Sequence, residues 1–111
     1  MSVRSAPSGF FERVWELVAA IPPGKVMTYG QISRCLDGAC SARYVGYAMA
    51  SAPAARNLPC HRVVNRLGEM APEGAFGGPG RQRALLEAEG VPFKANGRID
   101  LVLCLHEPDI R

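Results

Sequence analysis

The chain has 111 residues, 48% of them hydrophobic and 21% charged, with a formal net charge of +3. This length allows one compact domain with a modest core, over residues 1–111, and leaves no room for a second. No apolar run approaches the length of a membrane span, and Glu12 and Glu16 interrupt the only N-terminal apolar segment, which argues against a signal peptide. We therefore expect a cytoplasmic domain that makes no contact with a membrane.

The four cysteines are sparse and irregularly spaced for a disulfide framework. They are Cys35, Cys40, Cys60 and Cys104. A chain without a secretion signal usually keeps its thiols reduced, so free thiols are expected.

Basic charge is concentrated in the middle of the chain. Residues 38–68 contain no Asp or Glu but include Arg43, Arg56, Arg62 and Arg66. Arginine, which suits phosphate recognition, supplies eleven of the thirteen basic residues. This zone favours an anionic partner such as a nucleic-acid backbone, and a solvated basic face is the alternative that composition leaves open.

The first predicted element is an amphipathic helix over residues 8–20. Its apolar residues recur at helical spacing: Phe10, Phe11, Val14, Trp15 and Val18. Ser8 is the expected N-cap, and the Pro22-Pro23-Gly24 segment ends the helix. The aromatic residues are interpreted as core rather than as base-stacking groups.

Two short helices are predicted next. Thr28 is the expected N-cap of a helix that runs through Cys35, and Ser41 that of a second helix reaching Met49. With a Gly-containing turn at residues 37–40 between them, they have the arrangement of a helix-turn-helix, although simple core packing would give the same pattern. Small residues on the second helix would let it approach a groove closely.

The second half of the chain is predicted to contain less regular structure. Residues 59–64 indicate a short strand, and the turn at residues 65–68 suggests a hairpin. A Gly/Pro-rich loop over residues 72–80, suited to a pocket wall, precedes a helix over residues 81–89, and a terminal strand is expected at residues 99–103. The fold class is therefore α+β and mainly helical, a winged-helix-like domain with a helix-turn-helix and a short β-hairpin.

The segment Pro59-Cys60-His61-Arg62-Val63 sets a thiol beside an imidazole. A thiol is a weak nucleophile until a base removes its proton, and a neighbouring His can do this. Adjacent residues of a strand point to opposite faces, so Cys60 and His61 can cooperate only if the backbone turns or a water bridges them. A buried Cys beside a hydrogen-bonded His is the alternative.

Four segments occur in a characteristic order: Thr28-Tyr29-Gly30-Gln31, Ala42-Arg43-Tyr44-Val45-Gly46, Pro59-Cys60-His61-Arg62-Val63, and Leu85-Leu86 with Glu89-Gly90. Together they resemble the DNA-binding and active-site domain of O6-alkylguanine-DNA alkyltransferases, from about residue 10 to residue 90. Residues 64–68, 81–86 and 97–101 are similar also to the small single-domain alkyltransferase-like proteins. Those typically carry Trp or Ala at the position of Cys60 and bind damaged DNA without repairing it.

The resemblance implies that Cys60 takes the alkyl group from guanine O6, that His61 helps Cys60 lose its proton through a water, and that Glu89 orients His61. No cofactor and no metal are implied. The product thioether is stable, so each molecule would act once.

The resemblance also implies a minor-groove interface with duplex DNA and a flipped-out target base. In a bacterial source it further implies association with the nucleoid. Arg43 would fill the space left in the base stack, and Tyr29 would help to rotate the target phosphate. Tyr44 and Gly46 complete the implied DNA-binding set. The implied base pocket consists of Val63, Phe76, Gly77 and Gly78.

Two positions depart from the alkyltransferase pattern. Ala52 stands where an Asn usually braces the active-site turn, and Phe76 is the nearest aromatic to the place of a Tyr that donates to guanine. Both departures weaken the case for transfer but not the case for lesion binding. Irreversible transfer to Cys60 is favoured, and the alternative is a monomeric, non-enzymatic sensor that passes O6-alkylguanine to nucleotide excision repair proteins.

A structural zinc or redox site is a further alternative. It would use Cys35, Cys40, Cys104 and His106. Their spacing fits no common zinc motif well.

Overall fold

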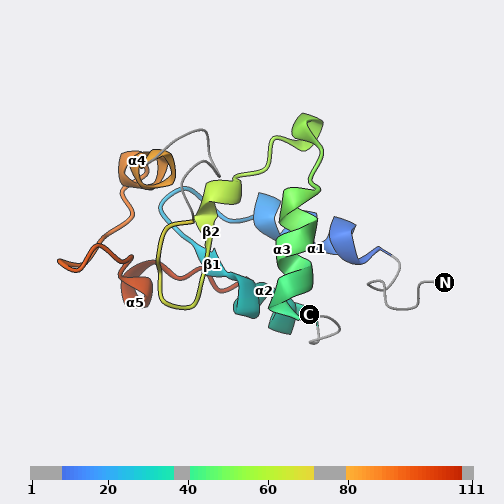
Figure 1. The fold of residues 1–111 in the computed structure, drawn as a ribbon, viewed down its shortest axis with the longest axis horizontal. Coiled ribbons are helices and arrows are strands. Elements are labelled where there is room, and N and C mark those ends of the chain that lie inside the picture. Colours follow the sequence, from blue (N-terminus) through green and yellow to red (C-terminus); the bar gives the residue numbers. More distant parts are fainter. Residues whose placement is uncertain (1–8, 37–40, 72–79, 109–111) are drawn as a thin grey trace.

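The computed structural model describes residues 9–36, 41–71 and 80–108 (Figure 1). The predicted first helix is confirmed as α1, Phe10–Ala19, with Phe10, Val14 and Val18 buried. The expected cap Ser8 lies outside the described residues, and Gly9, at φ 81°, occupies the N-cap position. The face that carries these buried residues packs into the core, as its periodicity predicts.

The two central helices are also confirmed. Strand β1, Met27–Thr28, leads directly into α2, Tyr29–Cys35, and α3 spans Ala42–Ala50. A capping box starts α2, because the Gln31 N–H donates to Thr28 Oγ1 at 3.0 Å and the Thr28 N–H donates to Gln31 Oε1 at 3.2 Å. Helix α3 packs against both α1 and α2, and the predicted turn at residues 37–40 lies outside the described residues (Figure 1).

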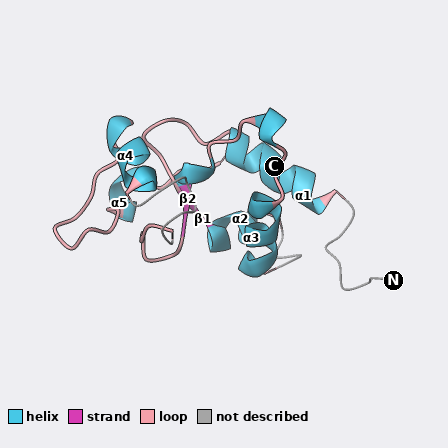
Figure 2. Cartoon of the chain, turned by 45° about the horizontal axis from the view of Figure 1, so that its top comes forward, coloured by secondary structure: helices cyan, strands magenta, loops and turns pink. Residues whose placement is uncertain are grey.

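The predicted β-hairpin is wrong. Strand β2, Val63–Val64, pairs with β1 in parallel, with Met27 opposite Val63 and Thr28 opposite Val64 (Figure 2). The predicted turn does form, since the Gly68 N–H donates to the Asn65 carbonyl at 3.0 Å. However, β2 already has a partner from early in the chain, and α2 and α3 supply the long crossover that parallel pairing requires.

The helix predicted near the C-terminal end is confirmed as α4, Arg81–Ala88, with Glu89 at its C-cap and Gly90 at φ 88° just beyond it. The predicted terminal strand is wrong, because the chain forms the short helix α5, Leu101–Cys104. Only Ile99 pairs there, in a bridge with Phe93. Beyond Ile99 the backbone forms helical hydrogen bonds in place of strand pairing, such as the one from the Leu105 N–H to the Leu101 carbonyl. Val102 is 92% exposed and covers no sheet.

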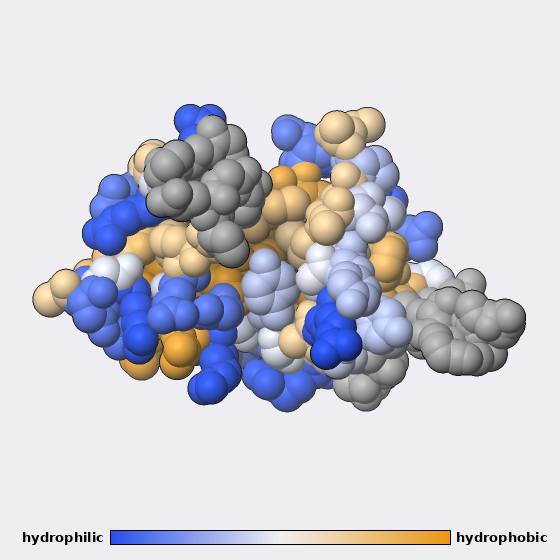
Figure 3. Space-filling model, viewed as in Figure 1, coloured by the Kyte–Doolittle hydropathy of each residue, from blue (hydrophilic) through white to orange (hydrophobic). Residues whose placement is uncertain are grey.

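Two hydrophobic clusters flank the short strand pair. One joins α1, α2 and α3, and the other joins α4 to the C-terminal segment. Met27 and Val63 belong to the first cluster, whereas Val26 and Val64 belong to the second, as expected when successive residues of a strand face opposite sides. Apolar residues are visible in the middle of the face drawn in Figure 3, among hydrophilic ones.

Candidate active site and nucleic-acid interface

Cys60 and His61 lie in a tight turn that connects the two clusters. This turn is the 3-10 helix η2, Cys60–Arg62, and we call it the reactive turn because it carries the candidate nucleophile. It directly precedes β2 and follows a second 3-10 helix, η1, Ala54–Arg56. The Arg62 N–H donates to the Pro59 carbonyl at 2.9 Å. The backbone therefore turns at the point where cooperation between thiol and imidazole requires it.

Glu89, at the end of α4, holds both residues that follow Cys60. The Glu89 carboxylate accepts from His61 Nε2 at 2.8 Å, and from Arg62 Nε at 2.9 Å and Nη2 at 2.7 Å. Arg62 Nη1 also donates to the Ile21 carbonyl at 2.7 Å, which ties this cluster to the end of α1. Arg62, a member of the basic zone at residues 38–68, is thus engaged in a structural ion pair with Glu89.

The charge state of Glu89 fixes the role of each His61 nitrogen. Hydrogen bonding from Arg62 is the main cause that lowers the pKa of Glu89 to about 2, against the opposing effect of burial and with a further contribution from His61. An ionised carboxylate can only accept, so His61 carries a proton on Nε2. In the neutral ring, Nδ1 then holds a lone pair and can act as a base.

The Cys60 thiol is half-buried and reduced, like Cys35 and Cys104. Burial raises its pKa, and a main-chain hydrogen bond at Cys60 acts in the opposite direction. Within the described part of the chain, no hydrogen bond joins the thiol to His61. Activation of Cys60 therefore requires a bridging group such as water.

The thiol lines a cavity of about 250 Å³ beside the end of α3. The other lining residues are Met49, Ala52, Pro53, Ala54, Asn57 and Leu58. Ala52, at the position where the resemblance leads one to look for an Asn, thus lines the same cavity as the Cys60 thiol. Most of the other lining residues are apolar. The Val63 side chain is buried in the core, so only its main chain can face a ligand, and Phe76, Gly77 and Gly78 lie outside the described residues.

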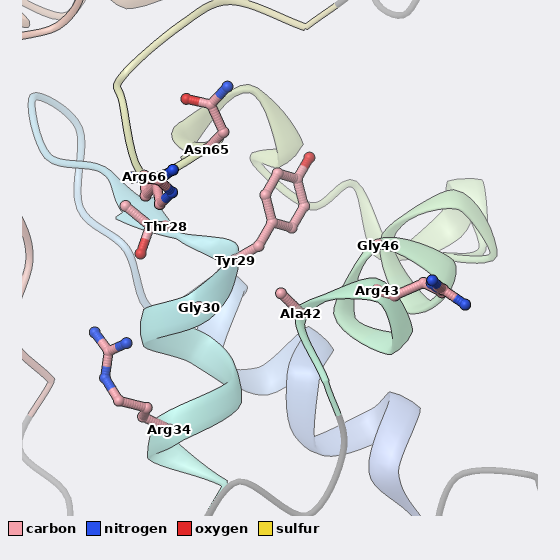
Figure 4. A pocket seen from close by; sticks show the side chains of 9 residues that line it. All are labelled: Thr28, Tyr29, Gly30, Arg34, Ala42, Arg43, Gly46, Asn65 and Arg66. Carbon is pink, nitrogen blue, oxygen red and sulfur yellow. The ribbon is translucent and has the colours of Figure 1, made fainter.

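A second hollow, of about 600 Å³, lies between the start of α2, the start of α3 and the turn after β2 (Figure 4). It brings together three of the four residues predicted to bind DNA, namely Tyr29, Arg43 and Gly46. Tyr44 does not line this hollow. Its half-buried ring packs against the core and makes an edge contact with the ring of Tyr47, with 5.4 Å between the ring centroids. We call this surface the basic groove.

Sequence reasoning missed Arg34 and Asn65 as groove residues, and it left Arg66 open between a phosphate contact and a solvent-facing position. All three line the basic groove and are exposed. Gly30 and Arg34 are four residues apart on α2, so helical spacing from the predicted Thr28-Tyr29-Gly30 segment could have found Arg34. Arg66 belongs to the basic zone at residues 38–68, whereas Asn65 carried no signal, because the parallel pairing that places it there joins distant segments.

Tyr29 connects the basic groove to the Cys60 turn. Burial is the main cause that raises the pKa of Tyr29, and the charge of a Cys60 thiolate raises it further. Tyr29 thus lines the groove and also interacts electrostatically with Cys60.

Gln82 of α4 is a second site residue that the sequence did not reveal. Its side chain is only 4% exposed. Its Nε2 donates to the His61 carbonyl at 3.0 Å, and its Oε1 accepts from the Ala71 N–H at 2.7 Å. A polar residue that reads as a solvent-facing helical position is therefore part of the support of the reactive turn.

The described residues give the zinc alternative no support. Cys35 and His106 line a common cavity of about 470 Å³, but Cys104 is buried elsewhere and its thiol contacts the Asp100 carbonyl at 3.4 Å. Cys40 lies outside the described residues. Over residues 9–36, 41–71 and 80–108, no group of three or more His, Cys, Asp or Glu side chains is placed to hold a metal ion.

No helix in those ranges is long and apolar enough to cross a membrane.

A family model described as the DNA-binding domain of 6-O-methylguanine DNA methyltransferase matches residues 9–91. The chain belongs to this family. It is 45% identical over 94 residues to the "DNA base-flipping protein" of Escherichia coli, covering 83% of this chain and 70% of that protein. It is 40% identical over 82 residues to "Alkyltransferase-like protein 1" of Schizosaccharomyces pombe, covering 74% of this chain and 76% of that protein.

Solved structures of family members confirm the mainly helical fold. An S. pombe alkyltransferase-like protein bound to damaged DNA containing O6-carboxymethylguanine superimposes with a TM-score of 0.73 at 35% identity, over 89% of this chain and 95% of that chain. A DNA complex of the Mycobacterium tuberculosis alkyltransferase gives a TM-score of 0.63 at 40% identity, over 74% of this chain and 50% of that chain. The family therefore includes DNA-binding proteins of both the alkyltransferase and the alkyltransferase-like type.

Proposed function

We propose that this protein repairs DNA by binding duplex DNA at the basic groove, flipping out O6-alkylguanine and transferring the alkyl group irreversibly to Cys60. The observation that carries the proposal is the contact at 2.8 Å between His61 Nε2 and the ionised carboxylate of Glu89. His61 lies in the same turn as the Cys60 thiol. This contact leaves Nδ1 of the neutral ring as a base for the Cys60 proton. The DNA complexes of related proteins support DNA as the partner.

The groove provides both contacts that base flipping requires. Helix α3 carries small residues, so its backbone can approach the minor groove, and Arg43 at its start can fill the gap left by the flipped base. Arg34 and Arg66, which line the groove and are exposed, would contact phosphates. The cavity beside Cys60 would then receive the alkylated base.

The transfer step balances without a cofactor. His61 Nδ1 accepts the Cys60 proton through a bridging water, and the thiolate attacks the alkyl carbon attached to guanine O6. A sulfur–carbon bond forms as the carbon–oxygen bond breaks, and the electron pair stays on guanine, which takes up a proton to become ordinary guanine. The thioether is stable, so Cys60 is consumed.

The test is intact-protein mass spectrometry after incubation with a stoichiometric duplex that contains a single O6-methylguanine. The parent protein is expected to gain the mass of one methylene, which is the methyl group in exchange for the thiol proton. Cys60→Ala is the matched control and should gain no mass while it still binds the damaged duplex in a gel-shift titration. Absence of any mass gain in the parent protein would exclude transfer.

A non-enzymatic lesion sensor is the second candidate. Two observations favour it: burial raises the pKa of the Cys60 thiol, and Ala52 has no side-chain amide with which position 52 could brace the turn. In this case the protein, acting as a cytoplasmic monomer, would pass the bound lesion to nucleotide excision repair proteins. Selective binding of the damaged duplex without mass gain would identify this function, and neither binding nor transfer would overturn both candidates.

A further inference from the structure

Helix α4 holds His61 at two points. The Glu89 carboxylate binds the imidazole, and the Gln82 amide binds the main-chain carbonyl of the same residue. Gln82 and Glu89 are seven residues apart, which is about two helical turns, so they project from one face of α4 toward the reactive turn. Both the ring and the backbone of His61 are therefore fixed by the same element.

The other end of the Gln82 amide fixes a second segment. Oε1 accepts from the Ala71 N–H at 2.7 Å, and Ala71 is the last described residue before the Gly/Pro-rich segment at residues 72–79. One buried amide thus joins the reactive turn to the chain that follows β2. Because the side chain is 4% exposed, removing either bond leaves a polar group in a site from which water is largely excluded.

The position where a brace was expected offers no such contact. Ala52 presents only a methyl group to the cavity that contains Cys60. The Gln82 amide supports the same turn from the opposite side of the cysteine, through the residue next to it. The support that is missing on the α3 side is thus present on the α4 side.

We propose that Gln82 is a positioning residue, which aligns His61 with Cys60 and compensates for the missing amide at Ala52. The proposal rests on the proposed function, since it requires that His61 assists Cys60. Donation to the His61 carbonyl is the critical bond, and acceptance from Ala71 is secondary. Gln82 then acts through His61, without contact with the lesion.

Two substitutions separate the two bonds. Gln82→Lys keeps a donor for the His61 carbonyl but cannot accept from Ala71, whereas Gln82→Glu keeps the acceptor and places a carboxylate against the His61 carbonyl. Gln82→Met keeps the approximate shape of the side chain and removes both bonds. The matched control is Gln31→Met, because Gln31 is also buried, 6% exposed, and also donates to a main-chain carbonyl, that of His106.

The measurement is the rate at which iodoacetamide modifies Cys60, followed by peptide mass spectrometry as a function of pH, without DNA. Cys35 and Cys104 serve as internal controls, since loosening of the fold would raise their labelling as well. Gln82→Glu and Gln82→Met should slow Cys60 modification at neutral pH by about tenfold, a part of what a positioned base contributes. The difference should vanish at high pH, where the thiol ionises without help, and Gln82→Lys and Gln31→Met should keep the parent profile.

His61→Ala distinguishes failure of this inference from failure of the proposed function. If His61→Ala slows Cys60 modification but Gln82→Glu and Gln82→Met do not, the role of Gln82 is overturned and transfer assisted by His61 stands. If His61→Ala has no effect, both are overturned. If all three Gln82 variants change Cys60 and Cys104 labelling together at every pH, Gln82 only stabilises the fold and the inference is wrong.

Discussion

The reactive turn and the basic groove are adjacent but are built in opposite ways. In the turn, His61, Arg62, Gln82 and Glu89 form a largely buried set of hydrogen bonds with fixed charge. In the groove, the arginines that Figure 4 labels, Arg34, Arg43 and Arg66, are exposed. The turn is pre-organised for one geometry, whereas the groove can adjust to a flexible polyanion.

The largest expected effect comes from removing the carboxylate that anchors the turn. Glu89→Ala should lower the free energy of unfolding by about 2–3 kcal/mol, because breaking a largely buried ion pair leaves Arg62 without its counter-charge. Denaturant unfolding checks this value. The matched control is Glu87→Ala, whose partner Arg83 lies on the exposed face of α4, and it should cost less than about 0.5 kcal/mol. Equal effects of the two substitutions would contradict the comparison.

The dependence of stability on pH should show the contribution of the same Glu89 carboxylate. The pKa of Glu89 in the folded protein, about 2, lies below its ordinary value of 4.5. A lowered pKa contributes stability that is present above the ordinary value and is lost as pH falls toward the folded one. The parent protein should therefore lose stability between about pH 5 and pH 2, and Glu89→Gln should lose less over that range. Identical pH curves would show that Glu89 is not held as described.

Substitutions in the basic groove should change the affinity for DNA and leave the stability of the fold unchanged. Replacing both Arg34 and Arg66 with Gln should reduce the slope of log K against log salt concentration by about 2, one for each phosphate contact. Fluorescence anisotropy titrations at several salt concentrations measure this slope. The free energy of unfolding should stay within about 0.5 kcal/mol of the parent, because both side chains are exposed. Arg13→Gln, on the exposed face of α1, is the control and should leave the slope unchanged.

Local signals in the sequence predict the parts of the fold that depend on local contacts. The cap at Thr28, the apolar spacing of α1 and Gly90 after α4 each identify an element within about a turn of its observed bounds. The parallel pairing of Met27 with Val63 has no local signature, since it joins segments separated by α2 and α3. The apolar residues at 99–103 likewise predict a strand, but pairing ends at the bridge of Ile99 with Phe93 and the chain continues as the short helix α5.

The same limit applies to the candidate site. Cys60, His61 and Glu89 were identified from the order of motifs, and the structure brings His61 and Glu89 into contact. The resemblance also pointed to the position at Ala52 whose amide is missing. It could not reveal Gln82, because a glutamine among charged residues of a helix reads as exposed until the packing of α4 against the turn is known.

The smallest expected effect comes from restoring the missing amide. Ala52→Asn places a hydrogen-bonding group in the cavity of about 250 Å³ beside Cys60, which has room for it. One added hydrogen bond, on the order of 1 kcal/mol, should raise the rate of Cys60 modification about fivefold. Ala54→Asn is the matched control, because Ala54 lines the same cavity from the exposed turn η1 and should have no effect. If Ala52→Asn also has no effect, the turn is already held as firmly from the α4 side as the reaction requires, and the cavity belongs to lesion binding and not to support of the thiol.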